Sequence, residues 1–93
     1  MEFEWDPDKA DRNFRRHGVS FDEARTVFGD PLARTVPDDV HSIDEERELT
    51  IGVSSAGHTI VVWHTQSRES TRTRIIGARR ATSTERRAYE SEE

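Results

Sequence analysis

The sequence predicts an α+β fold in which a twisted, mainly antiparallel sheet carries two N-terminal helices and a short C-terminal helix, all packed on one face. Its 93 residues suit one hydrophobic core. Two helix-capping signals occur within the first 23 residues, and segments that alternate apolar and polar residues dominate from residue 32 onward. The expected order is β-α-α-β-β-β-β-α, in a single domain of residues 1–93 whose tail, 90–93, is expected to fray.

The first third of the chain contains a short strand and two helices. Residues 3–5 alternate apolar and polar, and the strand stops at Asp6-Pro7, where Asp6 can cap a helix that has proline in its first turn. Gly18 supplies the left-handed residue that ends this helix. Ser20-Phe21-Asp22-Glu23 is a capping box, which predicts a second helix running to Gly29.

Four strands and a last helix account for the rest. Leu49, Ile51 and Val53 alternate with Thr50 and Gly52, which predicts a strand with one buried face. Residues 59–65 are apolar on both faces, as expected of a central strand. Thr82 to Glu85 form a second capping box. The expected ranges are 32–36 for a weak edge strand, 49–53, 59–65 and 71–78 for the others, and 82–89 for the helix.

The composition excludes several classes of protein. With 31% hydrophobic and 35% charged residues, no segment resembles a membrane span or a secretory leader. The chain has no cysteine, which excludes disulfides, thiolate metal sites and cysteine nucleophiles. We therefore expect a cytoplasmic protein without a metal or cofactor.

Charge is distributed unevenly along the chain. Residues 1–66 carry a net charge of −7, whereas residues 67–87 carry +5, and the whole chain carries −5. Thirteen of the 14 basic residues are arginine, whose planar guanidinium group suits phosphate and carboxylate. The basic segment is therefore a candidate local anion site. The alternative is a solvated surface of salt bridges.

The expected last strand presents its arginines in a pattern that favours RNA binding. Arg72 and Arg74 fall on one face, about 7 Å apart, which is close to the phosphate spacing of an extended single strand. Gly77 is expected to bend or bulge the strand and so to re-aim Arg79 and Arg80.

His64 is the candidate proton carrier beside these arginines. If the strands at 59–65 and 71–78 pair through the intervening turn, His64 lies near Arg72. A histidine can move a proton while guanidinium groups hold a phosphate, so we expect phosphodiester chemistry. The alternative is a partly buried histidine bonded to a neighbour. The candidate catalytic residues are His64, Arg72, Arg74, Arg79 and Arg80, and the last four are also the candidate RNA-binding residues.

Other notable residues favour structural roles. His17 is expected to stabilise a helix C-terminus. Trp5 and Trp63 are expected in the core rather than as platforms for bases. Arg86 and Arg87 are expected to pair with Glu85 and Glu90 across helix turns. A loop is favoured over a metal site for the group His41, Asp44, Glu45 and Glu46.

Four segments together resemble the BrnT family, small toxins of type II toxin–antitoxin systems. The likeness spans nearly the whole chain in matching order, with one departure: Gly77 stands where serine is frequent. The segments are Phe3-Glu4-Trp5-Asp6, His17-Gly18-Val19-Ser20-Phe21-Asp22-Glu23-Ala24, Val27-Phe28-Gly29-Asp30-Pro31-Leu32 and Arg74-Ile75-Ile76-Gly77-Ala78-Arg79-Arg80-Ala81.

The resemblance implies a RelE-like fold and a ribonuclease that arrests translation and growth as part of a bacterial stress response. It implies a BrnA-like antitoxin, a ribbon-helix-helix DNA-binding protein that neutralises the toxin. The toxin is then expected to reach operator DNA only through this antitoxin. By position it matches His64, Arg72, Arg74, Arg79 and Arg80 to the family's basic strand and histidine. We therefore expect a metal-independent endoribonuclease. The alternatives are a non-catalytic module that binds an antitoxin-like protein or nucleic acid, and a scaffold whose arginines are purely structural.

Overall fold

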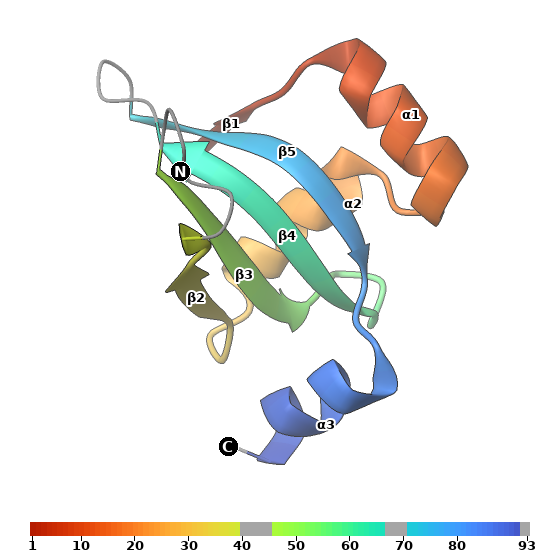
Figure 1. Cartoon of the computed structure of the whole chain (residues 1–93), viewed down its shortest axis with the longest axis vertical. Coiled ribbons are helices and arrows are strands. Elements are labelled where there is room, and N and C mark those ends of the chain that lie inside the picture. The colour runs from red at the N-terminus through yellow and green to blue at the C-terminus, as the bar shows by residue number, and fades with distance from the viewer. Residues whose placement is uncertain (40–45, 67–70, 92–93) are drawn as a thin grey trace.

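A computed structural model describes residues 1–39, 46–66 and 71–91 of the chain. Its elements follow the predicted order, with a 3₁₀ turn added after the second helix (Figure 1). They are β1 (Glu2–Glu4), α1 (Pro7–His17), α2 (Phe21–Thr26), η1 (Val27–Gly29), β2 (Arg34–Pro37), β3 (Arg47–Val53), β4 (Thr59–Gln66), β5 (Arg72–Arg80) and α3 (Ser83–Ser91).

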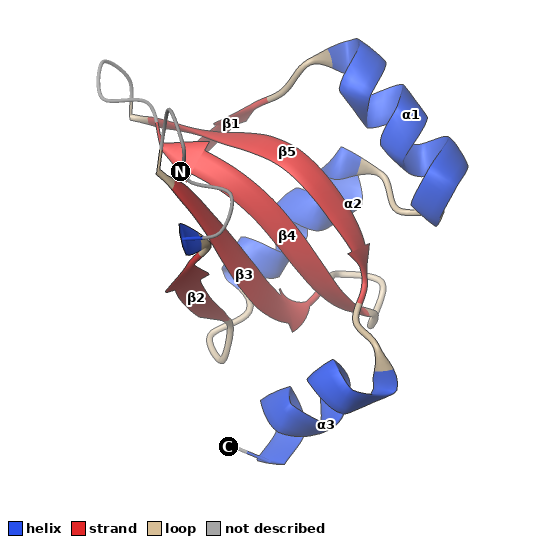
Figure 2. Ribbon diagram, viewed as in Figure 1, coloured by secondary structure: helices blue, strands red, loops and turns tan. Residues whose placement is uncertain are grey.

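The five strands form one sheet in the order β1-β5-β4-β3-β2 (Figure 2). The short β1 runs parallel to β5, and the other neighbouring pairs are antiparallel. β4 lies at the centre and β2 at an edge, as the sequence predicts. The mainly antiparallel α+β fold is therefore confirmed.

Local sequence signals set the ends of the helices. The Asp6 carboxylate accepts the backbone N–H of Asp8 at 2.9 Å, and Gly18 ends α1 in the left-handed region at φ 72°. Ser20 Oγ accepts the N–H of Glu23 at 3.0 Å. Each cap satisfies backbone groups that the helix itself leaves without partners.

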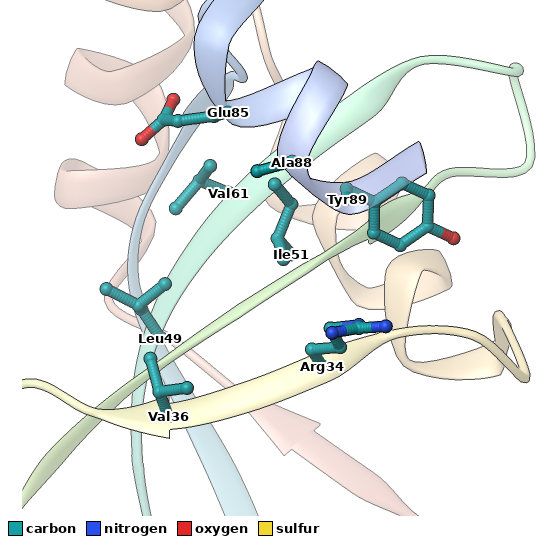
Figure 3. A pocket seen from close by; sticks show the side chains of 8 residues that line it. All are labelled: Arg34, Val36, Leu49, Ile51, Val61, Glu85, Ala88 and Tyr89. Atoms are coloured by element: carbon teal, nitrogen blue, oxygen red, sulfur yellow. The ribbon is translucent and has the colours of Figure 1, made fainter. Parts of the chain in front are cut away.

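The core lies between α2 with η1 and one face of the sheet, which we call the core face. Its fully buried side chains include Phe21, Ile60 and Val62, and Trp5 packs edge-to-face on Phe21 with ring centroids 5.9 Å apart. Trp5 is thus half-buried against the core, as expected, whereas Trp63, for which the core was also expected, is half-buried on the opposite face of the sheet. α3 lies across the other face, near Val61 (Figure 3), so the prediction that all helices pack on one face is wrong.

β3 buries the face opposite to the predicted one. Thr50 and Gly52 point into the core, whereas Leu49 and Ile51 are half-buried on the other face and Val53 is exposed. A Cβ atom on Gly52 would lie 2.9 Å from Val27 Cγ1, because η1 packs directly against the strand. Apolar alternation alone therefore misassigned the more deeply buried face.

α3 begins at its predicted capping box and extends beyond its predicted end. Thr82 Oγ1 accepts the N–H of Glu85 at 3.1 Å, and Glu85 Oε1 accepts the N–H of Thr82 at 2.8 Å. Glu90 and Ser91 are helical rather than frayed, and residues 92–93 lie outside the described residues. In the described part of the chain, no helix has the length and apolar character needed to cross a membrane.

Candidate functional site

A β-bulge in β5 decides which arginines share a face. Trp63 pairs with Gly77, but the next residue of β4, His64, pairs with Ile75, so Ile76 is the extra residue. Before the bulge, Arg72 and Arg74 lie on the face opposite the core, which we call the open face. After it, the alternation is reversed. The expected irregularity at Gly77 is confirmed.

Arg79 and Arg80, which are consecutive in β5, point to opposite faces, and the bulge decides which face each one takes. Arg79 pairs with Val61 and shares the open face with Arg74, whereas Arg80 pairs with Ile60 and points to the core-face side at the end of the strand. There Arg80 Nη2 donates to His58 Nε2 at 3.0 Å, and His58 Nδ1 lies 2.8 Å from Glu23 Oε2. Arg80 therefore belongs to a different surface from the other three arginines.

His64 lies on the core face, away from the arginines of the open face. It is 5% exposed, its Nε2 lies 2.7 Å from Thr50 Oγ1, and its ring meets Phe28 edge-to-face at 4.9 Å. Burial lowers its pKa to about 4. The expected proximity to Arg72 is wrong, because the register pairs His64 with Ile75, three residues further along β5, and both side chains face the core. The alternative, a buried histidine bonded to a neighbour, describes its position.

Arg72 and Arg74 form cross-strand ion pairs with the parallel strand β1. Arg72 Nε lies 3.2 Å from Glu2 Oε2, and Arg74 Nη1 lies 3.6 Å from Glu4 Oε2. The arginine side chains stay 55% and 42% exposed, so water screens both pairs and a phosphate can compete with these carboxylates.

Arg79 attaches α3 to the sheet. Its Nη1 and Nη2 donate to the two Glu85 oxygens at 2.7 and 3.0 Å, and its guanidinium lies over the Trp63 ring, 5.2 Å from the centroid. The paired hydrogen bonds raise the pKa of Arg79, and they lower the pKa of Glu85 to about 2. This bidentate partner occupies the guanidinium, which makes Arg79 an anchor for α3.

The structure therefore does not assemble the predicted set of five side chains. Arg72 and Arg74 share the open face, Arg79 is held by Glu85, and His64 and Arg80 lie on the other side of the sheet. Their roles in RNA cleavage stay predictions.

A second group of cations, which sequence reasoning missed, surrounds a depression of about 540 Å³ on the open face. Residues from both ends of α1 line it on one side, and β3, β4 and β5 supply the rest of the lining. It is lined by Lys9, Arg16, His17, Arg47, Trp63, Ile76 and Gly77. Arg74 lies beside this depression. It and Arg47, which is in the lining, are the two cross-strand partners of Thr65.

An adjoining depression of about 390 Å³ extends this basic surface along α1. It shares Lys9, Arg16 and His17 with the first and adds Arg12. Lys9, Arg12 and Arg16 recur at helical i, i+3 and i+7 spacing, so one face of α1 is cationic. That spacing is visible in the sequence and could have identified the face. What it could not show is that the face borders the sheet.

Asn13 holds α1 in this position. Its side-chain NH₂ donates to the carbonyls of Ala78 at 2.8 Å and Val19 at 3.0 Å, and its Oδ1 accepts the N–H of Ala78 at 3.2 Å. β1 ends at Glu4, which pairs with Arg74, so beyond that point the Asn13 amide takes the place of a neighbouring strand. The clamp lies next to the bulge.

Replacing Asn13 with alanine should lower the free energy of unfolding by about 2 kcal/mol, because three hydrogen bonds are lost and backbone groups of β5 lose their partner. Urea denaturation measures the effect. Arg12→Ala, at an exposed position on the same helix, is the control and should change stability by less than about 0.5 kcal/mol. Equal stability of the two variants would contradict the clamp.

A smaller, mostly apolar pocket of about 290 Å³ lies between α3 and the β2–β3 edge (Figure 3). Its polar groups are already engaged: Glu85 binds Arg79, and the Tyr89 hydroxyl donates to Asp30. We place the candidate site at the basic depression because its lining can hold an anion.

The described residues contain no set of side chains that could bind a metal ion. Within 1–39, 46–66 and 71–91, no three His, Asp or Glu side chains gather as a metal site requires. The group proposed as a loop rather than a metal site, His41, Asp44, Glu45 and Glu46, lies outside the described residues except for Glu46.

Comparison with solved structures identifies the class of fold. The structure superimposes on the 1.1 Å crystal structure of the Brucella abortus ribonuclease toxin BrnT with a TM-score of 0.68 and 22% identity, over 89% of this chain and 99% of that one. The two proteins share a fold. A search of curated protein sequences finds no match.

The family model described as "Ribonuclease toxin, BrnT, of type II toxin-antitoxin system" matches residues 5–85. The chain therefore belongs to the BrnT ribonuclease toxin family, as its sequence motifs indicated. Membership implies ribonuclease activity and a cognate antitoxin.

Proposed function

We propose that the protein is a metal-independent endoribonuclease that arrests translation and growth in the cytoplasm, and that a BrnA-like ribbon-helix-helix antitoxin neutralises it. One observation carries the site assignment. Lys9, Arg16, His17 and Arg47 converge on one depression of the open face, beside Trp63. RNA is then the substrate, and operator DNA is reached only through the antitoxin.

The cations supply the affinity for RNA. The chain carries a net charge of −5, but ions screen distant charges within about 8–10 Å at physiological salt, so the local cluster dominates. Lys9, Arg16 and Arg47 line the depression, and Arg74 flanks it. A phosphate held there would face several donors, which can also stabilise the charge that develops during cleavage.

Cleavage would proceed by attack of a ribose 2′-hydroxyl oxygen on the adjacent phosphorus. The bond from phosphorus to the 5′ oxygen breaks, leaving a 2′,3′-cyclic phosphate and a 5′-hydroxyl. The proton of the 2′-hydroxyl is removed, and a proton is delivered to the leaving oxygen. We assign both transfers to His17, which accepts the proton of the 2′-hydroxyl and then donates it to the leaving oxygen, because it is an exposed imidazole in the lining of the depression.

Within the same helix, Arg15 and Arg16 provide a matched test. Arg16 lines the depression, whereas Arg15 pairs with Asp11 at 2.6 Å and is 75% exposed. Arg16→Ala should lower kcat/KM for RNA cleavage by about 10- to 100-fold, the cost of losing a charged hydrogen bond. Arg15→Ala should change it less than about threefold. Cleavage of a labelled RNA, with and without chelator, measures both variants.

Three results would contradict the proposal: equal activity of the two variants, loss of cleavage in chelator, or RNA binding without cleavage. The last would favour the non-catalytic module that binds an antitoxin-like protein or nucleic acid. Expression with and without the adjacent gene, with growth and RNA integrity followed together, tests neutralisation by the antitoxin.

A further inference from the structure

We propose that Trp63 and Gly77 form a subsite for one nucleobase of a single-stranded RNA. The inference rests on the proposed ribonuclease site and adds a preference for an unstacked base there. Trp63 and Gly77 are direct cross-strand partners, and both line the basic depression. β5 therefore has no side chain at the position paired with Trp63, and its Arg79, two residues further on, lies over the ring.

Neither backbone conformation nor crowding requires glycine at position 77. Its φ is not positive, unlike those of Gly18 and Gly57. A Cβ atom there would have Asn13 Oδ1, at 4.0 Å, as its one neighbour within 4 Å. At Gly52, by contrast, a Cβ atom would lie 2.9 Å from Val27 Cγ1. The missing side chain at Gly77 leaves space beside the indole, and that space is part of the depression.

The indole is held in place before any ligand arrives. The Arg79 guanidinium lies over the ring, and Glu85 fixes that guanidinium through two hydrogen bonds. A fixed aromatic side chain loses little conformational freedom when a base stacks on it. Trp5 differs, because it packs on Phe21 within the core.

An aromatic side chain among cations matches the chemistry of single-stranded RNA. Bases stack on aromatic rings while cations contact the phosphates on either side. Lys9, Arg16 and Arg47 lie around the indole at the same depression. A duplex, whose bases are already stacked on one another, could not offer a base to this position.

The test measures binding of short 2′-O-methyl oligoribonucleotides, which lack the attacking hydroxyl and therefore remain intact. A series with one abasic position each is titrated against the wild-type protein and the variants Trp63→Ala, Trp63→Phe and Gly77→Leu. For the wild type, one abasic position should weaken binding about 5- to 100-fold. Trp63→Phe should retain most of this dependence. Trp63→Ala and Gly77→Leu should lose it, with circular dichroism reporting their folding.

Each outcome decides the proposal. If no abasic position weakens the affinity of the wild-type protein, there is no base subsite. Binding through the phosphates and the proposed function then still stand. If Gly77→Leu keeps the full dependence on the base, the subsite lies elsewhere. If the intact oligonucleotide fails to bind at all, the proposed RNA site fails and the subsite fails with it. Trp63→Phe and Gly77→Leu keep the test valid should Trp63→Ala not fold.

Discussion

Replacing His17 with glutamine should slow RNA cleavage by about 100-fold or more, because general acid–base catalysis typically supplies that much. His17 lies in the last turn of α1 and lines the basic depression. Glutamine keeps hydrogen-bonding groups at the position but cannot transfer a proton near neutral pH. Affinity for an uncleavable RNA should therefore change little. Single-turnover cleavage and equilibrium binding separate the two effects.

The matched control is His58→Gln. His58 bonds Glu23 and Arg80 at the far end of β4, away from the depression, so this variant should cleave RNA at nearly the wild-type rate. Induced expression of the His17 variant should also relieve growth arrest. Wild-type cleavage by His17→Gln would refute the assignment and leave the cations as the whole catalytic apparatus.

The second large effect concerns stability in mild acid. Burial lowers the pKa of His64 from 6.5 to about 4. Between these values the unfolded chain binds a proton that the folded protein does not, so acid favours unfolding. The free energy of unfolding should fall by about 3 kcal/mol as the pH drops from about 6.5 to about 4. Above pH 6.5 the contribution of His64 is fully present and constant.

The variant His64→Gln isolates the contribution of His64 to the pH dependence of the free energy of unfolding. Other groups also make the free energy of unfolding depend on pH. They include Glu85, whose pKa in the folded protein is about 2, and Glu48 is the cross-strand neighbour of His64. Urea denaturation of both proteins from pH 7.5 to 4 gives the difference curve. The variant should be less stable at pH 7.5 but should lose less stability on acidification. Parallel curves would show that His64 titrates normally in the folded protein.

The sequence predicted the elements well because their signals are local. Thr82 and Glu85 lie three residues apart and satisfy each other within one turn of helix, and at the same spacing the Ser20 hydroxyl accepts the N–H of Glu23. The apolar run of β4 predicted its central place, since a strand buried on both faces needs neighbours on each. The family motifs span these same elements.

The candidate site was harder to predict, because it depends on contacts between distant segments. A single extra residue, Ile76, moves Arg79 to the face of Arg74 and turns Arg80 away. Pairing of the two strands through the intervening turn also predicted His64 beside Arg72, but the register pairs His64 with Ile75 on the core face, under Phe28. A shift of one residue in register exchanges the faces of a strand, and in β5 the bulge makes that shift within the strand.

The chain by itself thus determined which segments become helices and strands, with ends correct to within a few residues, and which family the protein belongs to. Only the tertiary structure decided which charged groups meet. Asn13 joins α1 to Ala78, 65 residues later in the chain, and so brings Lys9, Arg16 and His17 to Trp63 and Arg47. Capping and periodicity act over one or two turns, whereas that meeting depends on packing and hydrogen bonds between elements distant in sequence.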